Sequence, residues 1–214
     1  MKTKIDKTLV IATVICLLPI VLAAFIYEKL PSQIPVHFDN AGNPDNYLPK
    51  SVAAFGLPVI FTVLNWYTHF RINHDPRVDN AAIIFRQVAK WLVPILSIIC
   101  IPTSMFIAMG AEIPINMISS AMVGVIIMIS GNYLPKSRQN YTVGIKLPWT
   151  LDSDVIWNKT HHFAGFLWVV GGGIITLGSF ISAYFMTIPI VIMLVLVPLA
   201  YSYYAYKAVK RGVE

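Results

Sequence analysis

Hydrophobic residues in this chain gather into six long stretches separated by short polar segments. The stretches cover residues 8–27, 52–70, 88–109, 114–131, 163–183 and 187–206. A helix needs about 20 mostly apolar residues to cross a hydrocarbon layer of ~30 Å. Inside that layer the backbone must satisfy its own hydrogen bonds, which favours helices. The pattern therefore predicts six transmembrane helices, with tight links at residues 110–113 and 184–187.

Composition supports the same class. Of the 214 residues, 57% are hydrophobic and 12% are charged, whereas soluble proteins carry about 25% charged residues. We therefore expect an all-α integral membrane protein made of a single membrane domain, residues 1–214. The first apolar stretch is longer than the ~7–15 residues of a signal-peptide core, so we interpret it as a retained helix.

Basic residues are distributed unevenly between the loops. Lys29 and Lys50 flank the first loop, and the other fourteen lie in alternate segments on the opposite side of the predicted spans. These fourteen are Lys2, Lys4, Lys7, Arg71, Arg77, Arg86, Lys90, Lys136, Arg138, Lys146, Lys159, Lys207, Lys210 and Arg211. The positive-inside rule places them in the cytoplasm, together with both chain ends. This arrangement favours an orientation signal in a lipid bilayer over direct binding of nucleic acid.

The sequence contains few residues or motifs typical of catalytic or ligand-binding sites. No Asp, Glu, Lys or Arg lies in the middle of a span, and HExxH, GxSxG and a phosphate-binding glycine loop are absent. His161 and His162 are consecutive and would point about 100° apart on a helix. We therefore predict no catalytic residue, no cofactor and no metal site. The alternatives are a small-molecule permease lined by Asn65, Asn116 and Ser120, and, ranked last, a membrane enzyme that uses His37 or His161.

Small residues and prolines within the spans predict how the helices pack. Gly171, Gly172 and Gly173 form a smooth patch that another helix can approach closely. Prolines such as Pro198 are tolerated in a membrane helix when a neighbour satisfies the carbonyl that they leave without a donor. His69 falls near the end of the second span, at the expected membrane interface.

The outer loop, residues 28–51, predicts a small folded motif of strand and turn. Apolar Ile34, Val36 and Phe38 alternate with other residues, which indicates a strand. Turn-forming residues follow from Asp39 to Pro44 and favour a hairpin. His37 and Asp39 are candidates for a pH-sensitive or metal-contacting pair, although the polar face of a strand explains them more simply.

The inner loop, residues 131–162, predicts a short interfacial helix. Thr150 can cap its N-terminus, with Asp152 and Asp154 near the positive end of the helix dipole. Trp157 and His161 are four residues apart and would share one face of that helix.

Two kinds of partner suit this inner loop. Trp149 and Trp157 would enter the lipid headgroup region while Lys146 and Lys159 meet anionic lipid. A surface that docks a cytoplasmic protein is the equal alternative.

Two segments carry a resemblance to a known family. They are IPVHFDNAGNPDNY, residues 34–47, and GNYLPKSRQNYTVGIKLPWTL, residues 131–151, which is followed by Trp157, Thr160-His161 and Gly165. The chain resembles the SdpI family, bacterial membrane proteins named for immunity to a secreted killing factor. The outer segment is similar to an IPxHF-type domain of unknown function that begins many of these proteins. Where the family pattern reads GIRTPWTL and then THR, this chain has Lys146, Leu147 and His162 at the departures.

The resemblance implies an immunity protein with two working surfaces. A secreted peptide or protein toxin would be sensed outside the cell, near His37, Asp39 and Gly42. A small helix-turn-helix repressor, or lipid, would dock at the cytoplasmic loop. The docking residues implied there are Asn140, Gly144, Lys146, Pro148, Trp149, Thr150, Trp157 and His161. Coupling between the two surfaces would need a helix rearrangement that both sites bias.

Overall fold

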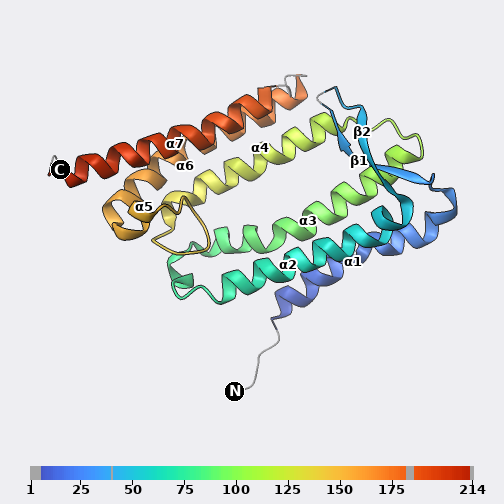
Figure 1. Cartoon of the computed structure of the whole chain (residues 1–214), viewed down its shortest axis with the longest axis horizontal. Coiled ribbons are helices and arrows are strands. Elements are labelled where there is room, and N and C mark those ends of the chain that lie inside the picture. Colours follow the sequence, from blue (N-terminus) through green and yellow to red (C-terminus); the bar gives the residue numbers. More distant parts are fainter. Residues whose placement is uncertain (1–5, 40, 182–185, 213–214) are drawn as a thin grey trace, which may run out of the picture. The chain divides into compact units, whose positions relative to one another are not determined.

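The structure, a computed structural model, describes residues 6–39, 41–181 and 186–212. Six helical segments in it are long and apolar enough to cross a membrane, which confirms the predicted all-α multi-pass architecture (Figure 1). The helices are α1 (Lys7–Ile26), α2 (Leu57–Asn73), α3 (Ile83–Ala108), α4 (Ile115–Tyr133), α5 (Pro148–Asp152), α6 (Asp154–Phe180) and α7 (Thr187–Lys210). Strands β1 (Gln33–Phe38) and β2 (Pro44–Pro49) form one antiparallel pair.

Two of the helices begin well before the apolar stretches that predicted them. The third begins at Ile83 rather than at residue 88, and the fifth begins at Asp154 rather than at residue 163. Hydropathy marks the part of a helix that lies in hydrocarbon, whereas caps and loop contacts decide where the helix begins. The predicted link at residues 184–187 falls partly outside the described residues.

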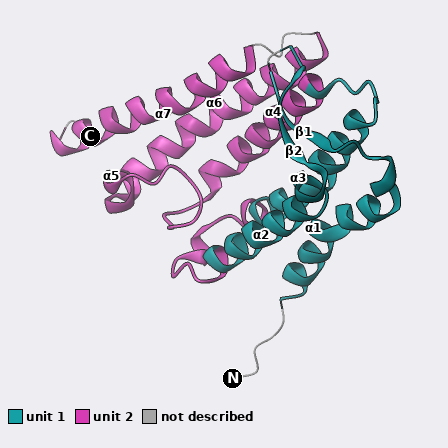
Figure 2. Ribbon diagram, turned by 45° about the vertical axis from the view of Figure 1, so that its right-hand side comes forward, with its two compact units in different colours: residues 1–71, 87–115 teal, residues 72–86, 116–214 magenta. Residues whose placement is uncertain are grey.

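The chain divides into two compact units (Figure 2). Unit 1 comprises Met1–Arg71 and Gln87–Ile115, and unit 2 comprises Ile72–Arg86 and Asn116–Glu214. Each unit has its own buried cluster of apolar side chains. The expectation of a single membrane domain stays a prediction.

In unit 1 the hairpin is attached to the ends of the helices by an apolar cluster. Ile34 of β1 is fully buried and lies in one cluster with Ala23 of α1 and Met105 of α3, and with Ala53 of the turn before α2. A π-helical turn, Val52–Gly56, leads from the hairpin into α2. Burial of Ile34 explains why the loop folds back as a hairpin, because an exposed two-stranded ribbon alone is marginally stable.

In unit 2, glycines let α4 and α6 approach until their backbones nearly touch. A Cβ on Gly172 would lie 2.6 Å from the carbonyl oxygen of Gly124, and one on Gly165 would lie 2.8 Å from that of Gly131. The prediction of a close-packing patch is thus confirmed for Gly172.

The neighbouring glycines of that patch differ from each other. Gly171 faces the side chain of Leu194 on α7, whereas a Cβ on Gly173 would meet nothing within 4 Å.

Helices α6 and α7 also form a hydrogen bond at a carbonyl that a proline leaves without a helical donor. The indole N–H of Trp168 donates to the carbonyl of Leu194, 2.7 Å away, and this carbonyl has no helical donor because residue 198 is proline. A neighbour therefore satisfies the freed carbonyl, as predicted.

Candidate functional site

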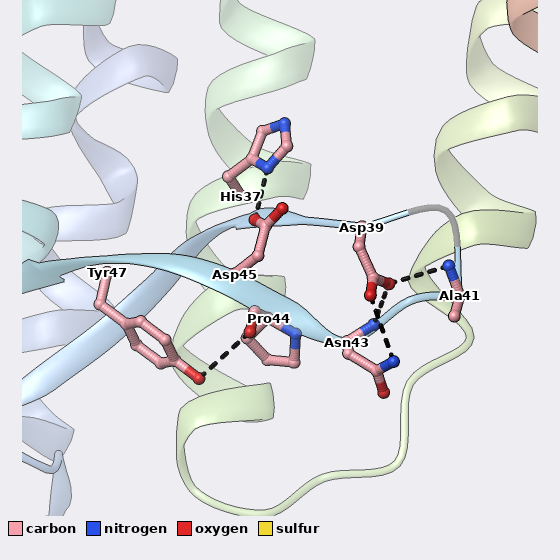
Figure 3. Close-up of polar contacts among 7 residues, drawn as sticks. All are labelled: His37, Asp39, Ala41, Asn43, Pro44, Asp45 and Tyr47. Carbon is pink, nitrogen blue, oxygen red and sulfur yellow. Dashed lines mark hydrogen bonds and ion pairs between the residues drawn. The ribbon is translucent and has the colours of Figure 1, made fainter.

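The outer motif is a short, irregular hairpin, as the sequence predicted (Figure 3). Gln33 pairs with Pro49 and Phe38 with Pro44, and the register shifts on both sides of His37. Most of β2 is exposed, whereas Ile34 and Pro35 near the start of β1 are buried within unit 1. The hairpin therefore presents β2 and its turn to the surroundings.

Asp39 builds the turn of this hairpin. Its carboxylate accepts the backbone N–H groups of Ala41 and Asn43, each at 2.8 Å, and the side-chain amide of Asn43. These bonds, the Asn43 N–H foremost, lower the pKa of Asp39 because they favour the ionised form. Gly42 completes the turn at a φ of 88°, where a side chain would be strained.

His37 pairs with Asp45 rather than with Asp39, which corrects the predicted pair. Nδ1 of His37 contacts a carboxylate oxygen of Asp45, and the two side chains are 68% and 45% exposed. Figure 3 shows the carboxylate of Asp39 turned away into the turn. Sequence spacing favoured the closer residue, but antiparallel pairing brings Asp45 across the hairpin to His37.

The inner site joins two segments that are far apart in sequence. Asp75, in the segment between α2 and α3, is only 6% exposed. One of its oxygens accepts the N–H of Tyr141 (3.0 Å) and the hydroxyl of Thr142, and the other accepts the N–H of Arg77 (2.8 Å). One buried carboxylate thus fixes the start of the glycine-containing turn that the family resemblance singled out.

A second set of bonds continues this connection. The side-chain amide of Asn80 donates to the carbonyl of Gln139 (2.7 Å), and the N–H of Arg138 donates to the carbonyl of Asn80 (2.8 Å). The Gln139 side chain in turn donates to the carbonyl of Thr150 (2.9 Å). The segment before α3 and the segment after α4 therefore lie on the same side of the membrane, as the alternation of basic loops predicts.

Trp157 and His161 form the centre of the inner site. Their rings stack at 3.9 Å between centroids, so the prediction that they share a helix face is confirmed. The indole N–H donates to the carbonyl of Ser137 (2.7 Å). The imidazole Nε2 accepts the N–H of Ile145 (3.0 Å), which leaves Nδ1–H to donate to the carbonyl of Trp157 (2.7 Å).

Gly144 lies directly over this stacked pair. Its φ is 113°, and a Cβ there would lie 2.5 Å from Nε2 of His161 and 3.1 Å from the Trp157 ring. Both the backbone angle and the available space therefore require glycine at this position.

Asn140 and Thr150 are fully buried and hold the loop from within. The Asn140 side chain accepts the N–H groups of Thr142 (3.0 Å) and Val143 (2.8 Å). The Thr150 hydroxyl accepts the N–H of Leu147 (2.9 Å).

Thr150 helps to cap the short helix, as predicted, but it is the third residue of α5 rather than the N-cap: its hydroxyl accepts the N–H of Leu147, the N-cap residue. Ser153 caps α6 by accepting the N–H of Ile156. Pro148 starts α5 before Thr150 is reached, because proline suits the first turn of a helix.

The predicted docking residues divide into buried and accessible groups. Asn140, Thr150, Trp157 and His161 have no exposed surface, so the expectation that Trp157 enters the headgroup region is wrong. Lys146 and Pro148 are exposed, and Gly144 and Trp149 are partly exposed. Among the predicted residues, these four can be reached by a partner.

Trp149 links α5 to the end of α7. Its indole N–H donates to the Ser202 hydroxyl (3.3 Å), and its ring lies 5.9 Å and 5.8 Å from the rings of Tyr203 and Tyr206. Lys146 donates to the carbonyls of Thr142 (2.8 Å) and Tyr141 (3.3 Å). Both side chains therefore have structural contacts as well as accessible surface.

Sequence reasoning missed the residues that connect the two segments: Asp75, Asn80, Ser137 and Gln139. Only Asp75 carried a signal, an acidic residue before Pro76 in a basic loop. Its partners Tyr141 and Thr142 lie 66 and 67 positions away, and no local pattern reveals such pairing. Within the described ranges, no three His, Cys, Asp or Glu side chains gather as a metal site would require.

Two family models match the chain. The SdpI/YfhL protein family matches residues 136–202, which include most of the inner site, and a domain of unknown function, DUF1648, matches residues 14–62, which include the hairpin. No solved structure matches the chain.

Two proteins of Bacillus subtilis (strain 168) are similar in sequence. The immunity protein SdpI is 30% identical over 207 residues, which cover 94% of this chain and 97% of that protein. The uncharacterized membrane protein YbgB is 41% identical over 51 residues, or 22% of this chain and 56% of that protein.

Proposed function

Because the chain belongs to the SdpI/YfhL family, we propose that it protects the cell that carries it from a secreted, membrane-active toxin. It is a multi-pass protein of the cell membrane. The observation that carries the proposal is the 30% identity to the immunity protein SdpI across 94% of the chain. This family is not a known enzyme family.

The direct test of protection is expression in a strain that the cognate toxin kills. The hairpin is the surface proposed to face the toxin, through His37, Asp39 and Gly42. We expect survival with the intact chain and at least a tenfold loss of survivors when Asp39→Ala opens the turn. Membrane levels of both proteins are compared by immunoblot. Unchanged killing by the cognate toxin in cells with the intact chain would exclude the proposal.

A second, separable role is recruitment of a small cytoplasmic repressor to the inner loop. The rigid framework around Trp157 and His161 supports this role, because it holds Lys146 and Trp149 in fixed positions at a partly exposed surface. Coupling from the hairpin would need a conformational change that both sites bias.

Two substitutions test this second role. Lys146→Ala removes an exposed charge, and Trp149→Ala removes an aromatic surface. We expect each to reduce membrane recruitment of the repressor at least fivefold, measured by fractionation, while toxin survival changes less than twofold. Trp149→Phe is the matched control, because it keeps ring contacts with Tyr203 and Tyr206. Equal loss of recruitment and survival at normal protein levels would contradict separate sites.

A further inference from the structure

Unit 1 contains a buried polar pair outside both loops. Asn65 and His69 lie one turn apart on α2 and are 0% and 1% exposed. The two amide atoms of Asn65 and the two ring nitrogens of His69 have no hydrogen-bond partner. Because residues four apart share a helix face, these four polar atoms lie together on one face of a single turn of α2. The sequence had placed His69 at the membrane interface, and the structure buries it within the protein.

The groups around His69 are mostly acceptors. A carboxylate oxygen of Asp6 lies 3.5 Å from Nδ1, and the ammonium of Lys90 lies 3.2 Å from the same oxygen. The backbone carbonyl of Lys90 also faces the ring, and it has no helical donor because residue 94 is proline. Neither acceptor makes a hydrogen bond of ordinary geometry with the ring.

Asn65 and His69 could be satisfied by a small molecule that both donates and accepts hydrogen bonds. A neutral imidazole has one N–H and one lone pair, so two facing acceptors cannot satisfy both nitrogens. Burying polar groups without partners is unfavourable, and proteins commonly satisfy such groups with internal water, which makes about three hydrogen bonds. One water can donate to a ring nitrogen and to the Asn65 carbonyl oxygen, and a second can accept from the Asn65 amide.

The neighbouring helix α1 carries a small side chain near this level. The indole N–H of Trp66 donates to Thr13 of α1 (2.8 Å), and Asp6 lies beside His69, so α1 and α2 run antiparallel. Between these two levels α1 presents Ala12, a small and fully buried side chain. The side chains of Asp6 and Lys90 are 28% and 12% exposed and connect the pair to the surface.

We propose that Asn65 and His69 form an internal water-binding site in unit 1, bounded by Asp6 and Lys90. Water occupies the polar face of α2 there and reaches the surface past the carboxylate of Asp6. This inference concerns neither loop and holds whether or not the chain confers immunity.

Water-edited solid-state NMR of the full chain in phospholipid liposomes tests the site directly. We expect magnetisation from water to reach the Asn65 amide and the His69 ring several-fold faster than the ring of His161. His161 is the internal control, since it is equally buried but both of its nitrogens bond to protein atoms. Equally slow transfer to both histidines overturns the proposal. Because the wild-type chain is used, the result does not depend on whether any variant folds.

Thermal unfolding of variants in detergent provides an independent check. If the pair holds water, Asn65→Leu and His69→Leu each lower Tm, and the double variant loses little more than either single variant, because both residues bind the same water. If the site is dry, removing unpaired polar atoms raises Tm, and the proposal fails. Thr62→Val is the matched control on the same helix, since its hydroxyl already bonds to the Pro58 carbonyl (2.9 Å).

Discussion

At the scale of single residues, the inner motif acts first as a framework. Four buried side chains form hydrogen bonds with the backbone of the loop itself: Asn140, Thr150, Trp157 and His161. The surface available to a partner is consequently built by residues such as Lys146 and Trp149, which the framework positions. A substitution within the framework should therefore disturb every function of the loop.

Gly144 gives the sharpest prediction at this scale. Gly144→Ala places a methyl group 2.5 Å from Nε2 of His161 at a φ of 113°. We expect a loss of stability of at least about 1–2 kcal/mol, from the backbone strain alone, measured as a lower Tm in detergent. Gly173→Ala is the control, because its Cβ meets nothing within 4 Å, and it should leave Tm unchanged or slightly higher. An unaltered Tm for Gly144→Ala would show that the loop is not held as described.

At the scale of elements, α4 and α6 each carry two glycines seven residues apart, and these glycines face one another across the contact. Gly124 and Gly131 face Gly172 and Gly165, so the two backbones approach without side chains between them. Lipid chains are as apolar as the helices, and such close contact is therefore a main source of association in a membrane.

This packing predicts a strong difference between adjacent positions. Gly172→Leu forces a side chain against the Gly124 carbonyl and should cost about 1–3 kcal/mol, or prevent assembly of unit 2. Gly173→Leu adds the same side chain to open space and should be tolerated. The measurement is the fraction of membrane protein that survives extraction and heating in detergent. Similar behaviour of the two variants would contradict the observed face of α6.

At the scale of the whole molecule, the predicted membrane topology concerns the two candidate surfaces. Three candidate spans lie between the hairpin and the inner loop in the sequence, so we expect the two on opposite sides of the bilayer. From the excess of basic residues we expect the inner loop in the cytoplasm.

Cysteine labelling tests this orientation. In a background without Cys16 and Cys100, Asn46→Cys in the hairpin should react with a membrane-impermeant maleimide in intact cells. Asn158→Cys, at an exposed position of α6, should react only after permeabilisation. Labelling of both positions from one side would rule out the six-span topology and with it the proposed division of labour.

The six spans, the hairpin and the alternation of basic loops could all be predicted from the amino-acid sequence. Each depends on properties that are local in sequence: lipid selects for apolar length and flanking charge, and the hairpin follows from period-two alternation and turn residues. The folded structure was needed to show that His37 pairs with Asp45, that Asp75 accepts hydrogen bonds from Tyr141 and Thr142, and that Trp157 is buried. Those outcomes depend on hydrogen-bond partners distant in sequence, whose proximity exists only after the chain has folded.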